Sequence, residues 1–299
     1  MKYKYSNEVK NNDDLRESFN QLTQQVFCFN FRKWYELGHW GDKYVPHVLI
    51  DGVQVISNIS VNLMQFDVFG VTKNYIQLGT VMTDPAYRGQ GLNREIMERI
   101  LNEYAGKVDG IYLFGNDSVL DYYPKFGFKE SKEYEYYMRV ENQKNVDAYL
   151  MERVDMHNDE QCVRLYDAIK AIDKDTKHRN QNDAMCMINN LGLMQFWFAA
   201  EYEDQIYYLP ELGVYVIANV NKEVLEICQI IGKELVDIKR LAKTFGEPIK
   251  EVVLKFTPVQ KEQFLVREHK VEDSTLFIMG EDLHRIERDQ MIFSELSHA

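Results

Sequence analysis

The 299-residue sequence is poor in basic residues relative to acidic ones. Lysine and arginine together number 35 against 47 aspartates and glutamates, which gives a formal net charge of −12 and a pI near 5.1. Nucleic-acid binding depends on clustered Lys and Arg, so we expect no nucleic-acid partner. A surplus of carboxylates can attract a cationic amine, although acidity also serves solubility in general.

Long apolar runs and paired cysteines are also missing. The longest apolar stretches, such as residues 214–218, are of strand length, and the first five residues lack the apolar core of a signal peptide. We therefore expect a cytoplasmic protein without a membrane partner. The four cysteines are far apart and form no C-x-x-C pair, which predicts buried, structural thiols, no disulfide and no metal site: Cys28, Cys162, Cys186 and Cys228.

The first half of the chain alternates strands and helices. Asp51-Gly52 between two apolar runs predicts a β-hairpin. A strand is expected over residues 75–82, a helix with one apolar face over 92–104, a buried strand over 109–115 and a last strand over 134–140. This order predicts an α/β fold with a mixed sheet and helices on its faces.

The second half contains the same mixture of elements. We expect helices over residues 159–172 and 235–243, and strands over the following ranges: 207–209, 214–220, 224–231, 252–256 and 275–279. Residues 141–145 are polar and without periodicity. The sequence therefore predicts two domains, 1–144 and 145–299.

The loop Arg88-Gly89-Gln90-Gly91-Leu92-Asn93 connects the strand at 75–82 to the helix at 92–104. A helix N-terminus directs unpaired N–H groups and a positive dipole at one point, which suits a phosphate or pyrophosphate. The glycines let the main chain come close to an anion. The Rossmann and Walker patterns are both absent, so a dinucleotide or nucleoside triphosphate is a weaker expectation than another pyrophosphate ligand.

These residues resemble the central motif of the GNAT acetyltransferase superfamily, Q/R-x-x-G-x-G/A after a strand that ends near a proline. Arg88 and Gly91 match the first and fourth positions, while Asn93 replaces the usual Gly or Ala at the sixth. Farther on, Asn116 closes the next strand, and the segment from Tyr123 to Phe128 is similar to the family's Tyr-x-x-x-Gly-Phe. The resemblance covers about 50 residues and implies a GNAT-type, mostly antiparallel mixed sheet.

The resemblance also implies an acetyl-CoA site. Main-chain groups of Val81, Met82 and Thr83 would hold the pantetheine arm and the thioester, and Asn116 would contact the arm. The pyrophosphate would be bound by the loop and the first helical turn: Arg88, Gly89, Gln90, Gly91, Leu92, Asn93 and Arg94.

Tyr123 would stand near the cofactor's sulfur, and a phenol there can act as general acid for the departing thiolate. Without the resemblance, Tyr123 would read as a packed aromatic. No general base stands out: Glu36, His39 and His47 lie in the part of the chain where an acceptor site is expected, and ordered water could serve instead.

The second half resembles a degenerate GNAT-type domain without a glycine loop, so one cofactor site per chain is expected. Some two-domain members of the superfamily place the terminal carboxylate in the active site, which makes Ala299 a catalytic candidate.

The leading interpretation is an acetyl-CoA-dependent N-acetyltransferase that acts on a primary amine of a small molecule, a lysine or an N-terminus. The alternatives are a non-catalytic acetyl-CoA-binding regulatory module and a nucleotide-binding enzyme. The sequence leaves the acceptor and the oligomeric state open, because acceptor pockets are built from variable loops.

Overall fold

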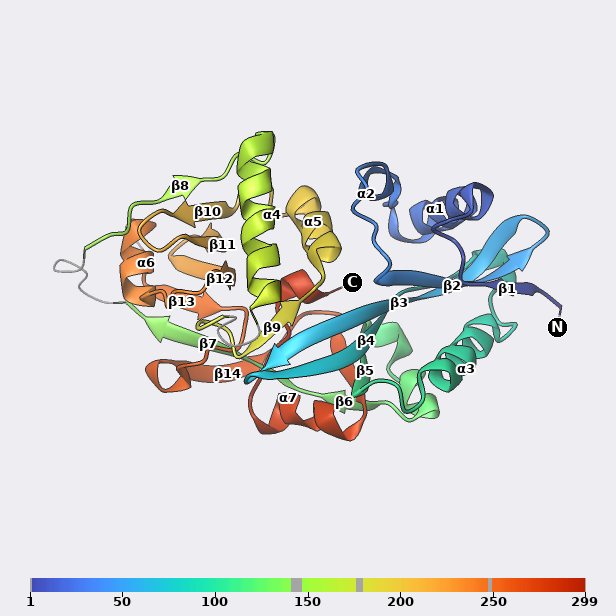
Figure 1. Ribbon diagram of the computed structural model, residues 1–299. Coiled ribbons are helices and arrows are strands. Elements are labelled where there is room, and N and C mark those ends of the chain that lie inside the picture. The colour runs from blue at the N-terminus through green and yellow to red at the C-terminus, as the bar shows by residue number, and fades with distance from the viewer. Residues whose placement is uncertain (1, 141–146, 176–179, 247–248, 299) are drawn as a thin grey trace.

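The computed structural model describes residues 2–140, 147–175, 180–246 and 249–298. It forms two lobes, each built around one sheet (Figure 1). The strands of the first sheet follow the order β1-β2-β3-β4-β5-β15-β6, with β9 paired to β3. The second sheet has the order β14-β7-β13-β12-β11-β10-β8. The predicted mixed, mostly antiparallel sheets with flanking helices are confirmed.

The first sheet contains these strands: β1 (Lys4–Ser6), β2 (Tyr44–Asp51), β3 (Gln54–Val68), β4 (Val71–Thr83), β5 (Gly110–Gly115), β6 (Lys129–Ser131), β9 (Met185–Ile188) and β15 (Thr275–Met279). Its helices are α1 (Asp13–Phe27), α2 (Arg32–Glu36) and α3 (Leu92–Tyr104). The hairpin expected at Asp51 and Gly52 joins β2 to β3. Helix α1 was not predicted.

The second sheet contains these strands: β7 (Glu133–Arg139), β8 (Glu152–Arg153), β10 (Ile206–Leu209), β11 (Val214–Asn221), β12 (Val224–Ile231), β13 (Glu251–Leu254) and β14 (Leu265–His269). The helices outside the first lobe are α4 (Asp159–Lys174), α5 (Leu191–Ala200), α6 (Ile238–Thr244) and α7 (Arg285–Arg288). The sequence did not predict β9, β14 or α5.

Alternation along the strands explains how the first sheet is covered on both faces. Leu49 on β2 packs into the core beneath α3, whereas its neighbours Val48 and Ile50 pack against α1 and α2. Successive side chains of a strand point to opposite faces, so a strand that is apolar throughout needs helices on both sides. Figure 1 shows α1 and α2 on one face of the sheet and α3 on the other.

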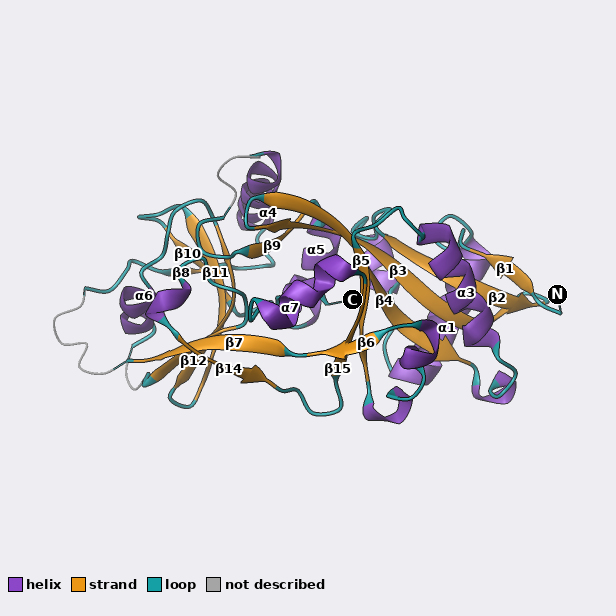
Figure 2. Ribbon diagram, turned by 90° about the horizontal axis from the view of Figure 1, so that it is seen from below, coloured by secondary structure: helices purple, strands orange, loops and turns teal. Residues whose placement is uncertain are grey.

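The chain passes between the two sheets four times, at β6–β7, β8–β9, β9–β10 and β14–β15, and the first and last of these crossings lie side by side. β6 of the first sheet is separated by one residue from β7 of the second, and the two run nearly in line (Figure 2). β14, paired with β7, leads back to β15, which pairs with β5 and β6. The predicted division at residues 144 and 145 stays a prediction, and residues 141–146 lie outside the described part. The first sheet holds β9 and β15 of the second half, and the second sheet holds β7 of the first half.

The segment after α7 lies between the lobes and belongs to a core that both sheets share. Phe293 stacks on Tyr112 of β5 with ring centroids 4.1 Å apart, and both side chains are fully buried. The same core includes Leu165 of α4 and Phe198 of α5. The lobes are therefore joined by apolar packing as well as by the crossings of the chain.

The cysteine prediction is wrong in part. Cys186 and Cys228 are buried and Cys162 is partly buried, but Cys28 is exposed. Cys28 caps the C-terminus of α1 in the left-handed region, at a φ of +63°, and its neighbours Phe27 and Phe29 are exposed as well. All four thiols are free. Within the described residues, no helix has the length and hydropathy needed to cross a membrane.

Candidate active site

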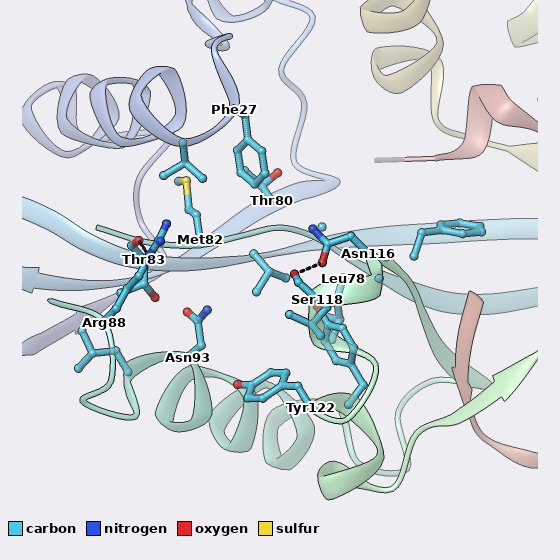
Figure 3. Close-up of a pocket in the computed structure, with 18 of the residues that line it drawn as sticks. Phe27, Leu78, Thr80, Met82, Thr83, Arg88, Asn93, Asn116, Ser118 and Tyr122 are labelled. Atoms are coloured by element: carbon cyan, nitrogen blue, oxygen red, sulfur yellow. Dashed lines mark hydrogen bonds between the residues drawn. The ribbon is translucent and has the colours of Figure 1, made fainter. Parts of the chain in front are cut away.

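The two central strands of the first sheet diverge toward one end. β4 and β5 are parallel and paired from Tyr75 opposite Gly110 to Leu78 opposite Leu113. Beyond this point β4 continues to Thr83 and β5 to Gly115, but the two strands no longer pair with each other. A cleft of about 980 Å³ opens where the strands separate, bounded by 77–83, 114–116 and the start of α3 (Figure 3).

A β-bulge in β4 accompanies this separation. The register of β3 and β4 shifts between Asn58 and Ser60, where β4 carries one extra residue. Thr80 in the bulge has a φ of +48°. Such a backbone conformation is strained for a β-branched residue, so the surrounding structure has to hold it.

Buried polar side chains of β2 and β3 stabilise this conformation of Thr80. Asn58 donates from Nδ2 to the Thr80 carbonyl oxygen (2.8 Å) and to Ser60 Oγ (2.9 Å). The hydroxyl of Tyr44 hydrogen-bonds with Thr80 Oγ1 (2.8 Å) and accepts from Ser60 Oγ (2.9 Å). We call Tyr44, Asn58, Ser60 and Thr80 the bulge network. It ties both the side chain and the carbonyl of the strained residue to β2 and β3.

The loop before α3 presents an open helix N-terminus to the cleft. Gly89 and Gly91 have φ values of +76° and +77°, which glycine adopts without penalty. Gly91 is the N-cap of α3, and no side chain caps the helix there. The first N–H groups of α3 are therefore free to bind an anion, and the helix dipole favours one.

Asn93, the departure from the family pattern, has a contact of its own. Its Oδ1 accepts from Ser57 Oγ at 2.5 Å, and Ser57 also hydrogen-bonds with Thr83 Oγ1 at 2.9 Å. The amide thus ties the first turn of α3 to the ends of β3 and β4. Figure 3 shows its side chain rising from α3 into the cleft.

Nearly all of the predicted site residues line this one cleft. Those that do are Val81, Met82, Thr83, Arg88, Gly89, Gly91, Leu92, Asn93, Arg94, Asn116 and Tyr123. The side chain of Gln90 turns away and accepts from Tyr3 Oη at 3.1 Å. Ala299 lies outside the described residues. The functional roles of all these residues stay predictions.

Tyr123 is packed on three sides, with 4% of its surface exposed. A Cβ on Gly115 would lie 2.9 Å from the Tyr123 ring, so the glycine makes room for it. The rings of Phe277 and Tyr122 are each 5.3 Å away between centroids. Burial raises the pKa of Tyr123 to about 12. The phenol therefore keeps its proton at neutral pH and can donate it.

The histidines suggested by the sequence are not at the cleft. Neither His39 nor His47 lines it, and the same holds for Glu36. His47 is fully buried and its Nδ1 hydrogen-bonds with Tyr5 Oη at 2.7 Å. Burial lowers the pKa of His47 to about 4, which fits a structural imidazole.

His298, which the sequence reasoning missed, does line the cleft. Its ring stacks on Phe114 of β5, with centroids 4.0 Å apart. Trp197 of α5 donates from Nε1 to the His298 carbonyl oxygen at 2.8 Å. Apolar residues precede it in the sequence, but only the shared core between the lobes brings this segment to the cleft.

In the described part of the chain, no group of acidic, histidine and cysteine residues could hold a metal ion.

The mixed, mostly antiparallel sheet and the glycine loop that opens α3 agree with the GNAT-type fold that the sequence resemblance implies. Comparison with known families agrees: residues 9–131 match the model described as the acetyltransferase (GNAT) domain. Over these residues the chain is similar to the GNAT acetyltransferases, a family of acyltransferases.

Solved structures extend the similarity of fold to both lobes. A GCN5-related N-acetyltransferase from Kribbella flavida has a TM-score of 0.58 at 13% identity, covering 94% of this chain and 71% of that one. A GCN5-related N-acetyltransferase from Anabaena variabilis ATCC 29413 has a TM-score of 0.57 at 12% identity, covering 92% of this chain and 72% of that one. A probable N-acyltransferase from Enterococcus faecalis V583 has a TM-score of 0.55 at 15% identity, covering 93% of this chain and 70% of that one. At these identities the likeness concerns the fold.

Proposed function

We propose that the protein transfers an acetyl group from acetyl-CoA to a primary amine in the cleft between β4 and β5. The observation that carries the proposal is the uncapped N-terminus of α3, which opens onto that cleft through Gly89 and Gly91. This site fits a pyrophosphate. Arg88 and Arg94 line the same cleft and add positive charge beside it.

The rest of the cleft fits the remainder of the cofactor. Its walls are the ends of β4 and β5, which no longer pair with each other there, so the edge of β4 that faces β5 is open to an extended amide-containing arm. Asn116 on the opposite wall accepts from Ser118 Oγ at 2.8 Å (Figure 3). Its Nδ2 can donate to the same arm.

Acetyl-CoA, when bound, would supply a thioester whose carbonyl carbon is open to attack by a neutral amine nitrogen. The C–N bond forms and the C–S bond breaks, the nitrogen gives up one proton, and the departing thiolate takes up one proton to leave as the thiol. The chain positions the reactants and polarises the carbonyl. A main-chain N–H near Met82 or Thr83 is suited to stabilise the oxyanion. Tyr123, protonated at neutral pH, is suited to donate to the departing sulfur.

A thermal-shift comparison with acetyl-CoA, ATP and NAD, followed by thiol release with a panel of amines, tests the proposal. We expect stabilisation by acetyl-CoA alone and thiol release with at least one amine. Saturable binding of acetyl-CoA without turnover on any amine would favour a non-catalytic binding module instead. Stabilisation by ATP or NAD and none by acetyl-CoA would refute both and favour a nucleotide-binding enzyme.

A further inference from the structure

A separate cavity of about 250 Å³ lies where the start of α5 meets the first sheet. Its walls come from α2, from the strands β2 and β3 and from residues 189–193. Trp34 of α2 donates from Nε1 to the carbonyl oxygen of Gly192 at 2.8 Å, which holds α5 beside α2 (Figure 1). We call this space the α5 cavity. Since a water molecule takes up about 30 Å³, the cavity has room for a small solute together with several waters.

The N-terminus of α5 opens into the α5 cavity without a cap. Leu191, Gly192 and Leu193 form the first turn of this ten-residue helix, and all three line the cavity. Asn190 is the N-cap, a residue type that usually accepts from N–H groups of the first turn. Here its Nδ2 is directed to Met64 Sδ at 3.4 Å, and its side chain makes no capping bond. The N–H groups of the first turn and the positive end of the helix dipole are therefore available to an anion.

A buried side chain of β3 points to a ligand in the same cavity independently of the helix. Asn62 lines the cavity and is 2% exposed, yet its Nδ2 has no hydrogen-bond partner among the described residues. It is paired with Tyr44 of β2, which also lines the cavity. Residues opposite each other on paired strands project to the same face, so Asn62 points with Tyr44 toward α2. An unmade hydrogen bond of a buried amide costs about 1–3 kcal/mol, which a ligand that accepts from Nδ2 recovers.

The charge that lines the α5 cavity is positive. Lys43, just before β2, lines it and has no ion-pair partner in the part of the chain that the structure describes. None of the described carboxylates lines it, although the chain carries a net charge of −12. Asp173 contacts one lining residue without lining the cavity itself: it accepts from the N–H of Asn189 at 2.8 Å. An unpaired cation beside an uncapped helix N-terminus favours an anionic ligand.

We propose that the α5 cavity binds a small tetrahedral oxyanion, of which inorganic phosphate is the simplest. Its oxygens accept from the first N–H groups of α5, from Asn62 Nδ2 and from the ammonium group of Lys43. These donors approach from the helix, from β3 and from the start of β2, so an ion with four oxygens suits them. The inference is independent of the proposed acetyl transfer, because none of these donor residues lines the cleft.

The test has to separate this ion from one bound at the N-terminus of α3. Gly91→Asp does so, because an aspartate at that N-cap accepts from N–H groups of the first turn and repels a second anion. Calorimetry of this variant with inorganic phosphate, at constant ionic strength, then reports the α5 cavity. We expect saturable binding, together with a rise in melting temperature as phosphate is added.

Three further substitutions in that protein test the position of the ion. Lys43→Gln should weaken phosphate binding about tenfold or more, because it removes a charge-assisted hydrogen bond. Lys33 of α2 is exposed and lines neither the cleft nor the α5 cavity. Lys33→Gln therefore changes the net charge equally and should leave the affinity within about threefold. Asn62→Asp keeps the shape of the side chain but adds a negative charge, and it should abolish binding.

Absence of saturable phosphate binding in the Gly91→Asp protein would overturn the proposal, and so would equal affinities after Lys43→Gln and Lys33→Gln. Lys43 is partly exposed, so its replacement should leave the melting temperature without phosphate unchanged and keeps the test decisive even where Asn62→Asp does not fold. Sulfate should displace bound phosphate, and acetate should displace far less of it. Equal displacement by sulfate and acetate would overturn the assignment to a tetrahedral oxyanion.

Discussion

Replacing Asn58 by alanine tests whether the shape of the cleft, and with it turnover, depends on the bulge network. Asn58 is fully buried, and its Nδ2 donates to both the Thr80 carbonyl and Ser60 Oγ. The substitution removes both hydrogen bonds, and Asn58 itself does not line the cleft. Any loss of turnover then arises from the position of β4 itself.

The magnitude follows from two opposing terms. Two intramolecular hydrogen bonds contribute about 1 kcal/mol each to stability, whereas a left-handed conformation costs a residue with a Cβ about 1–2 kcal/mol. Asn58→Ala removes the first term and leaves Thr80, at a φ of +48°, with only the hydrogen bond between its Oγ1 and Tyr44 to hold it. We expect the bulge to relax toward a regular strand. A misdirected oxyanion donor lowers kcat by about 100-fold or more.

The assay is thiol release with the best acceptor of the amine panel, together with calorimetric measurement of acetyl-CoA affinity. Asn58→Ala should lower kcat far more than it weakens cofactor binding. Adding Thr80→Gly should restore part of kcat, because glycine adopts a positive φ at no steric cost.

Asn62 offers a matched control on the same strand. It is 2% exposed, and its Nδ2 has no hydrogen-bond partner in the described chain. Asn62→Ala therefore removes similar volume from β3 but no hydrogen bond that the structure shows. A kcat for Asn58→Ala within about threefold of that for Asn62→Ala would refute the reasoning, as would absence of rescue by Thr80→Gly.

Three further predictions concern the acid, the anion site and pH. Tyr123→Phe should lower kcat by about 100-fold with unchanged acetyl-CoA affinity, whereas Tyr122→Phe should change kcat little; thiol release measures both. Gly91→Asp should weaken acetyl-CoA binding in calorimetry much more than Gly91→Asn, since both tolerate a positive φ but only aspartate repels the pyrophosphate. Burial raises the pKa of Glu133 to about 7, despite the hydrogen bond it accepts from the Phe293 N–H. The folded state therefore binds more protons between pH 4.5 and 7, and stability falls as pH rises through that window. Glu133→Gln should stabilise the protein by up to about 3 kcal/mol at pH 8 and little at pH 4.5, measured by urea unfolding; equal effects at both pH values would contradict this.

Local sequence patterns predicted the elements around the cleft well, because these elements are consecutive in sequence. The apolar face of residues 92–104, the glycines before it and the buried strand after it correspond to α3, its open N-terminus and β5. Each of these rests on the spacing of neighbouring residues, which a sequence displays directly. The same proximity let the loop and the strand ends be assigned to one site.

The junction between the lobes could not be predicted in the same way. β15 inserts between β5 and β6, more than 140 residues away in the chain, and periodicity carries no information about pairing partners. His298 reaches the cleft only because Phe293 and its neighbours fill the core between the lobes. Nothing in the five residues around His298 distinguishes it from a surface histidine.

The second sheet shows why the chain has one predicted cofactor site although it repeats the central unit. β12 and β13 are parallel and joined through α6, as β4 and β5 are joined through α3. At the start of α6, however, Asp237 accepts from the N–H groups of Lys239 and Arg240 at 2.9 and 3.1 Å. A carboxylate of the chain thus occupies the position where α3 leaves its N–H groups free beside Gly91. The helix dipole favours an anion at the N-terminus of α3 and at that of α6. At α6 the chain itself supplies the anion, Asp237, whereas at α3 a ligand has to supply it.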